Sequence, residues 1–142
     1  MGDDDAGVAV HDWLHSTRVP PWAAAAGDVA WVTAFVLIGR SSHTEGESVA
    51  GVARTLWPFL IGLAAGWAVA RAWRRPAAVL PTGVVVWPVC VAVAMALRAA
   101  SGQGVAVAFI GVALAFVGLG LVGWRVVAGL VARRLPSGAR PG

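Results

Sequence analysis

Two charged residues stand beside or within long apolar runs, and they are the first candidates for chemistry. Asp28 lies inside the apolar run 22–39, and Arg125 directly follows the run 99–124. A carboxylate and a guanidinium form strong paired hydrogen bonds, and ionisable groups within a membrane pair with each other or face a cavity. We therefore expect Asp28 and Arg125 to be partners. They form either an ion pair that fixes helix packing or a polar site for a substrate, a proton or a lipid headgroup.

A second group of basic side chains marks the ends of the apolar runs, and it could hold an anion. Its members are Arg40, His43, Arg54 and Arg98. Several cationic donors gathered at one end of a bundle would suit a phosphate headgroup or a carboxylate. The alternative is that these are interfacial residues that end helices, with Glu45 and Glu47 neutralising their neighbours across the loop.

Other candidate residues are weaker. His11 and His15 have the i, i+4 spacing of metal ligands, but no third ligand is fixed nearby, and we expect an interfacial segment there. The single Cys90 has no disulfide partner and is expected to be a small buried apolar residue. The chain has no nucleophile elbow, phosphate loop, HExxH or CxxC motif. We therefore assign no catalytic residue, metal or cofactor, and nothing nominates an enzyme.

The elements that must position these residues follow from the composition. The 142 residues are 58% hydrophobic and 13% charged, with a mean hydropathy of +0.75. About 20 helical residues cross a hydrocarbon core of about 30 Å. Four apolar runs predict an all-α, four-helix transmembrane bundle, with spans at about 22–39, 54–72, 77–98 and 104–128. We expect a membrane domain at 21–132, between a partly disordered N-terminal segment (1–20) and a disordered tail (133–142).

The distribution of arginine predicts the orientation. Four spans place eight arginines on the side of both termini and three on the opposite side. The first group is Arg18, Arg71, Arg74, Arg75, Arg125, Arg133, Arg134 and Arg140, and the second is Arg40, Arg54 and Arg98. Because cytoplasmic loops carry the excess of basic residues, the N-terminus and C-terminus are expected in the cytoplasm, with the chain in the plasma (inner) membrane. Asp28 and Arg125 would then lie at similar depth near the cytoplasmic side.

Small residues predict how the helices pack. Positions 104, 108, 111, 115 and 118 of the fourth span are all Gly or Ala and fall on one seam. The second span carries Gly62 and Gly66, which are followed by Ala70. Small residues let helix backbones approach closely, and this close packing is a main source of helix affinity in lipid. Both stripes are therefore expected to face neighbouring helices.

The order of several short motifs resembles a known family. The marks are Asp28, "IGRSSH" (38–43), "WPFLIGLAAGW" (57–67), "GVVVWP" (83–88), "ALR" (96–98) and "GWR" (123–125). Over about residues 27–125 the chain resembles the uncharacterised prokaryotic integral membrane family known as domain of unknown function 3054, found chiefly in actinobacteria and haloarchaea. The resemblance implies four membrane helices and carries no activity. It also implies that Asp28, Arg40, His43, Arg98 and Arg125 are polar marks of the family.

Three classes of function fit this sequence. The first is a small binding or accessory protein that packs on a membrane partner or holds a lipid. The second is a minimal transporter or channel protomer, which would have to form a homo-oligomer because four short helices enclose little space. The third is a membrane enzyme that acts on a lipid or quinone. The bilayer is the one partner common to all three. Nucleic acid is not expected, because the arginines form no basic stripe with interleaved aromatic residues.

Overall fold

The computed structural model describes residues 19–41 and 48–134. The expectations about the N-terminal segment 1–18, the loop 42–47 and the tail from 135 onward lie outside the described residues. The same is true of His11, His15, His43, Glu45 and Glu47.

The described part of the chain is helical and contains no strand. It comprises α2 (Pro21–Ser41), α3 (Val49–Ala70), the short π-type turn η1 (Val79–Gly83), α4 (Val84–Ala100) and α5 (Val107–Arg134). With η1 and α4 taken together, four helices are long and apolar enough to cross a membrane. The all-α prediction with four spans is therefore confirmed.

Two helix bounds differ from those expected. The second helix begins at Val49 rather than near residue 54, because Ser48 caps its N-terminus by accepting a hydrogen bond from the Gly51 amide. The fourth helix continues to Arg134, so Arg133 and Arg134 belong to α5 and not to the tail.

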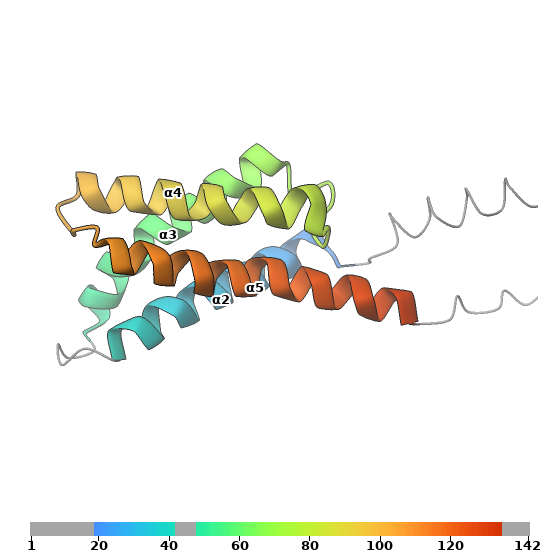
Figure 1. Ribbon diagram of the computed structural model, residues 1–142, viewed down its shortest axis with the longest axis horizontal. Coiled ribbons are helices and arrows are strands. Elements are labelled where there is room, and N and C mark those ends of the chain that lie inside the picture. The colour runs from blue at the N-terminus through green and yellow to red at the C-terminus, as the bar shows by residue number, and fades with distance from the viewer. Residues whose placement is uncertain (1–18, 42–47, 135–142) are drawn as a thin grey trace, which may run out of the picture.

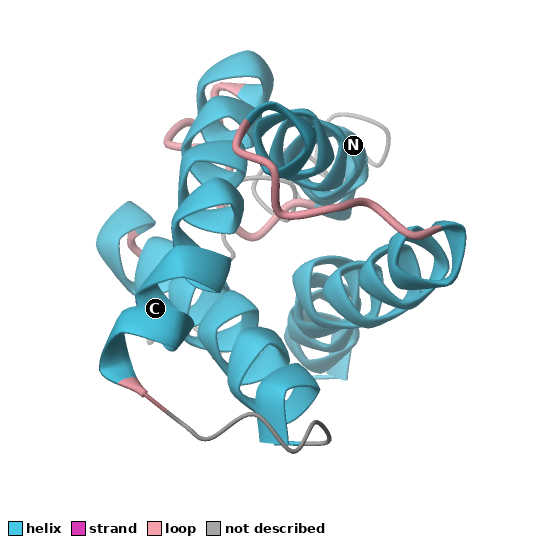
Figure 2. Ribbon diagram, turned by 90° about the vertical axis from the view of Figure 1, so that its left-hand side faces the viewer, coloured by secondary structure: helices cyan, strands magenta, loops and turns pink. Residues whose placement is uncertain are grey.

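The four helices run antiparallel, and each packs on two neighbours (Figures 1 and 2). The pairs in contact are α2 with α3, α3 with α4, α4 with α5, and α5 with α2, and the α3–α4 pair is the closest. One end of the bundle, on the left in Figure 1, holds the end of α2 and the start of α3. We call it the Arg40 end, and the opposite end the Asp28 end.

Glycine residues explain why α3 and α4 lie so close. A Cβ atom added at Gly66 would lie 2.8 Å from the carbonyl oxygen of Val86, and one added at Gly62 would overlap the backbone of Cys90. The small-residue stripe of the second span therefore packs on a neighbouring helix, as expected.

The small-residue seam of α5 packs over only part of its length. Gly118 lies against the Trp87 indole, but Gly104 and Gly111 face open space. A cluster of four aromatic rings packs between α2, α3 and α5. Its members are the chain's four phenylalanines, Phe35, Phe59, Phe109 and Phe116. Gly104 and Gly111 lie at exposed positions, so the part of the seam toward the Arg40 end faces away from the neighbouring helices.

Two indoles from other helices bind the backbone of α5 near its middle. In each case a Trp Nε1 donates to a carbonyl oxygen at 2.9 Å, and a glycine stands four residues after that carbonyl. The donor, acceptor and glycine are Trp31, Phe116 and Gly120 in one set, and Trp87, Leu114 and Gly118 in the other. A side chain at either glycine would overlap the indole. The glycines therefore let two indole N–H groups reach backbone acceptors, which the protein itself must supply in a hydrocarbon surrounding.

Candidate functional site

The structure brings Asp28 of α2 and Arg125 of α5 together. Both residues are 0% exposed, although they stand 97 positions apart in the chain. Arg125 Nη2 lies 2.7 Å from Asp28 Oδ2, and Arg125 Nη1 lies 3.1 Å from Oδ1. The pairing is therefore bidentate, the strongest arrangement for a guanidinium and a carboxylate.

Two tryptophans complete the surroundings of the Asp28 carboxylate. Trp67 of α3 donates its Nε1–H to Oδ2 at 2.9 Å, and Trp124 of α5 donates to Oδ1 at 2.8 Å. Each carboxylate oxygen therefore accepts one charged and one neutral hydrogen bond. We call Asp28, Arg125, Trp67 and Trp124 the Asp28 cluster.

Neither tryptophan was predicted to be a site residue from the sequence. Trp22, Trp73 and Trp124 all lie near the ends of predicted spans, where an amphipathic indole ring commonly sits at the membrane interface. Trp22 and Trp73 do face outward, with 76% and 51% of their surface exposed, but Trp124 turns inward to Asp28. Each cluster tryptophan directly follows a glycine, Gly66 or Gly123, in the motifs "AGW" and "VGW". This glycine–tryptophan pair is the feature of the sequence that could have pointed to the two residues.

The remaining donors of Arg125 bind the backbone. Its Nε donates to the carbonyl oxygen of Pro76 at 2.9 Å, and Nη1 also donates to that of Leu121 at 2.6 Å. Its guanidinium carbon lies 4.5 Å from the centre of the Trp124 ring. Arg125 thus joins α2, α5 and the α3–α4 connection at one point. Four of the five N–H groups of this guanidinium are used by protein acceptors, which is the pattern of a fixed structural contact.

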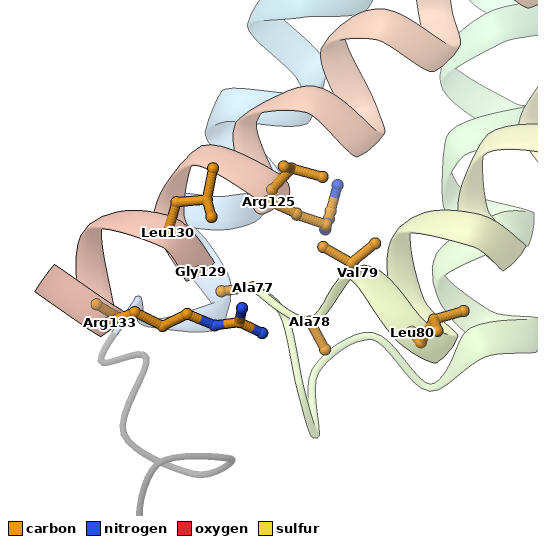
Figure 3. A pocket seen from close by; sticks show the side chains of 10 residues that line it. Ala77, Ala78, Val79, Leu80, Arg125, Gly129, Leu130 and Arg133 are labelled. Carbon is orange, nitrogen blue, oxygen red and sulfur yellow. The ribbon is translucent and has the colours of Figure 1, made fainter.

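A pocket of about 430 Å³ lies beside this cluster, between α5 and the segment 77–80 (Figure 3). In that view Arg125, Leu130 and Arg133 come from α5, and Val79 and Leu80 come from the facing segment. The lining is largely aliphatic. Because the Arg125 guanidinium already bonds to protein groups, the pocket offers a ligand mainly apolar contacts.

The Arg40 end carries a cavity of about 540 Å³ that three predicted residues line. Arg40 of α2, Arg54 of α3 and Arg98 of α4 all border it, and we call them the arginine cluster. The other lining residues are Ser48, Gly51, Thr55, Gly102 and Gln103. Three of the four residues expected there are thus brought together, and the fourth, His43, lies outside the described residues.

Arg40 is held from one side only. Its Nη1 donates to Thr55 Oγ1 at 3.1 Å, and that hydroxyl in turn donates to the Gly51 carbonyl oxygen. The guanidinium lies over Gly51, where any Cβ atom would overlap it. Its Nε is buried and has no hydrogen-bond partner among the described residues.

Arg98 shows the same incomplete bonding. Its Nη1 donates to Gln103 Oε1 at 3.1 Å and its Nη2 to the Gly104 carbonyl oxygen at 3.4 Å. The guanidinium lies over the Phe109 ring, 4.5 Å from its centre. The Nε of Arg98 is also buried without a partner among residues 19–41 and 48–134. Such an unsatisfied buried donor is unusual in a folded protein and calls for an explanation.

The electrostatics of the two ends differ. Asp28 is the only Asp or Glu within residues 19–41 and 48–134, and it pairs with Arg125. The acceptors that the structure places on Arg40 and Arg98 are neutral oxygens. The N-terminus of α3, at Ser48, adds the positive end of a helix dipole to the same cavity. The cavity therefore has a positive character in the part of the chain that the structure describes.

An apolar chamber of about 590 Å³ adjoins this cavity. Arg40, Thr55 and Arg98 line both spaces. The rest of the chamber is formed by residues of α2, of α5 and of the segment before α5, namely Phe35, Val36, Gly39, Ala106, Ala108, Phe109 and Val112. A polar space and an apolar space thus meet at the same arginines.

No group of three His, Cys, Asp or Glu side chains that could hold a metal ion occurs within the described ranges. Cys90 is buried, and its Sγ lies 3.6 Å from the Phe59 carbonyl oxygen, in the manner of a small core residue.

The comparisons with known proteins agree with the resemblance in the sequence. The family described as "Protein of unknown function (DUF3054)" matches residues 25–128, a range that contains the Asp28 cluster and the arginine cluster. No curated protein and no solved structure matched the chain. The match covers most of the chain and includes all or most of each of the four apolar helices. The chain therefore belongs to the DUF3054 family, and it is built as a multi-pass membrane protein.

Proposed function

We propose that the protein binds an anionic lipid headgroup at the arginine cluster, and that it serves as a small lipid-binding or accessory protein of the membrane. The observation that carries this proposal is the pair of buried Nε–H donors, on Arg40 and Arg98, that lack partners among the described residues. Both residues line one cavity, and they do so together with Arg54.

A bound anion would supply the hydrogen-bond acceptors that the buried Nε–H donors of this cavity lack. Burying an N–H without an acceptor costs about 1–3 kcal/mol, and more when the group is charged. A phosphate brings several acceptor oxygens and a negative charge, so it can bond with both guanidinium groups at once. Ser48 and Gln103 add polar groups to the lining, and the α3 N-terminus adds a favourable dipole.

The orientation that we propose places this site in the outer leaflet of the plasma membrane. It is supported by the excess of arginine on the side of the two termini. A single cysteine at Gly102, in a Cys90→Ser background, is expected to react with an impermeant thiol reagent added to intact cells. A cysteine at the exposed Arg74 is expected to react only after the cells are opened. The reverse pattern would place the arginine cluster on the cytoplasmic side.

The Asp28 cluster is a poorer candidate for ligand binding. Its carboxylate already accepts four hydrogen bonds, and both members of the ion pair are fully buried. A ligand would have to displace these contacts before it could bind. We assign to this cluster the role of fixing the helices on which the arginine cluster stands.

Native mass spectrometry tests the proposal. The protein is released from nanodiscs that contain equal amounts of phosphatidylglycerol and phosphatidylcholine. We expect a retained phosphatidylglycerol adduct that Arg40→Gln/Arg98→Gln weakens by at least about tenfold, since a charged hydrogen bond contributes about 1.5–3 kcal/mol and about 1.4 kcal/mol corresponds to tenfold. Arg74→Gln/Arg75→Gln removes the same two charges from exposed positions at the other end and serves as the control. Equal adducts in the double variant and the control would refute a headgroup site at these arginines.

The loop glutamates provide the competing explanation. If Glu45 and Glu47 neutralise the arginines, Glu45→Gln/Glu47→Gln will destabilise the protein and the anionic lipid will show no preference over phosphatidylcholine. If the site takes an external anion, the same variant will bind phosphatidylglycerol at least as tightly as the natural chain, because a competing negative charge has been removed.

A further inference from the structure

The apolar chamber beside the arginine cluster identifies the kind of anion. On the basis of the proposed headgroup site, we infer that the ligand is an anionic phospholipid of the surrounding leaflet, with one acyl chain lying in the chamber between α2 and α5. Three residues line both spaces, so a headgroup in the polar cavity is already at the entrance of the apolar chamber.

The lining of the chamber suits a hydrocarbon chain. Its walls are Phe35 and Val36 from α2, and Phe109 and Val112 from α5. At about 590 Å³ it lies within the range of about 300–1,000 Å³ that is typical of small-molecule pockets. Filling it with water would leave the water without polar partners over most of the wall, whereas an acyl chain makes contacts throughout.

The chamber also opens toward the exposed face of α5. Val112 lines it and is 57% exposed, and Ala108 is exposed as well. In a bilayer this exposed face of α5 meets lipid, so a chain can enter sideways without leaving hydrocarbon. A free phosphate or a soluble carboxylate has no hydrocarbon chain to place in this chamber. The source of the anion is therefore the membrane itself.

Phe109 contacts an arginine of the cluster and also lines the chamber. One face of its ring carries the Arg98 guanidinium, at 4.5 Å, and the ring also forms part of the chamber wall. The cation is thus held at the edge of the apolar space by a cation–π contact. Because an acyl chain passes from one apolar surrounding to another, the headgroup supplies the affinity and the chamber sets the position of the chain.

Photo-crosslinking distinguishes this inference from the proposed function. A phosphatidylglycerol probe with a diazirine in one acyl chain is incorporated in nanodiscs, and an equal amount of phosphatidylcholine with the same chain serves as the reference. We expect the phosphatidylglycerol probe to label the segments that hold Phe35, Val36, Phe109 and Val112, and the reference to label them only weakly.

Two matched variants complete the test. Ala108→Phe fills the chamber, and Ala115→Phe places the same ring on an exposed position of α5 away from it. Ala108→Phe should reduce labelling of the chamber to the level of the reference probe while the headgroup adduct persists in native mass spectra. Ala115→Phe should leave both unchanged. Full chamber labelling in Ala108→Phe, or an adduct in the natural chain without chamber labelling, would overturn the inference and leave the headgroup site standing. Loss of the adduct in the natural chain would overturn both.

Discussion

The two ends of this bundle use arginine in opposite ways. At the Asp28 end, Arg125 is fully buried and meets a carboxylate, two carbonyl oxygens and an indole ring. At the Arg40 end, Arg40 and Arg98 each keep a buried Nε–H without a partner in the described part of the chain. A saturated guanidinium holds helices together, and an unsaturated one is available to a ligand. This difference separates a structural cluster from a candidate binding site within one small protein.

The largest effect on stability is expected from variants of the Asp28–Arg125 ion pair. Asp28→Asn and Arg125→Gln should each lower the free energy of unfolding by about 3–5 kcal/mol. Each variant removes one member of the ion pair and leaves the charge of the other member buried and uncompensated. Thermal unfolding in detergent measures the loss, with Arg54→Gln as an exposed control. The double variant should lose less than the sum of the two single variants. Strict additivity would show that the two groups do not act as a pair.

A smaller effect should come from the indoles of the same cluster. Trp67→Phe and Trp124→Phe each remove one hydrogen bond to the carboxylate and keep much of the ring. We expect each to cost about 1.5–3 kcal/mol, as measured for hydrogen bonds to charged groups. Trp73→Phe changes an exposed ring and should cost little. If all three variants melt alike, the carboxylate does not depend on these donors.

The smallest effect on stability is expected at the arginine cluster, where the change should appear in binding. Gly51→Ala places a methyl group where the Arg40 guanidinium lies, so Arg40 must move. Stability should change by less than about 1 kcal/mol, since alanine also favours the helix over glycine. The phosphatidylglycerol adduct should weaken, and Gly123→Ala, which meets open space in α5, should leave it intact. A stable Gly51→Ala protein with undiminished lipid binding would remove Arg40 from the site.

Much of the fold could be predicted because it depends on hydropathy and on the cost of charge in lipid. The runs of apolar residues gave four helices, and the similar depths of Asp28 and Arg125 suggested a contact that the structure contains. The helix that carries the second span begins at Val49, before the span start expected near residue 54, because the Ser48 cap extends it beyond the apolar run.

Other features depend on three-dimensional packing that no spacing rule contains. Trp67 and Trp124 could not be predicted as partners of Asp28 from their residue type, because tryptophan is also common at the membrane interface. The outer half of the α5 seam was expected to touch a helix, but Gly104 and Gly111 lie at exposed positions and meet open space. The roles of Thr55 and Gln103 as partners of Arg40 and Arg98 likewise depend on side-chain positions.

The ion pair between the first and the last described helix has a consequence for biogenesis. A ribosome delivers α2 before α5, so Asp28 enters the membrane well before Arg125 has been synthesised. Until then its carboxylate has neither its guanidinium partner nor the Trp124 indole, and the partly inserted chain carries an exposed polar defect in a hydrocarbon surrounding. When α5 packs on α2, it supplies three of the four hydrogen bonds that this carboxylate accepts. A chain truncated before this helix would keep an unpaired carboxylate in the hydrocarbon surrounding.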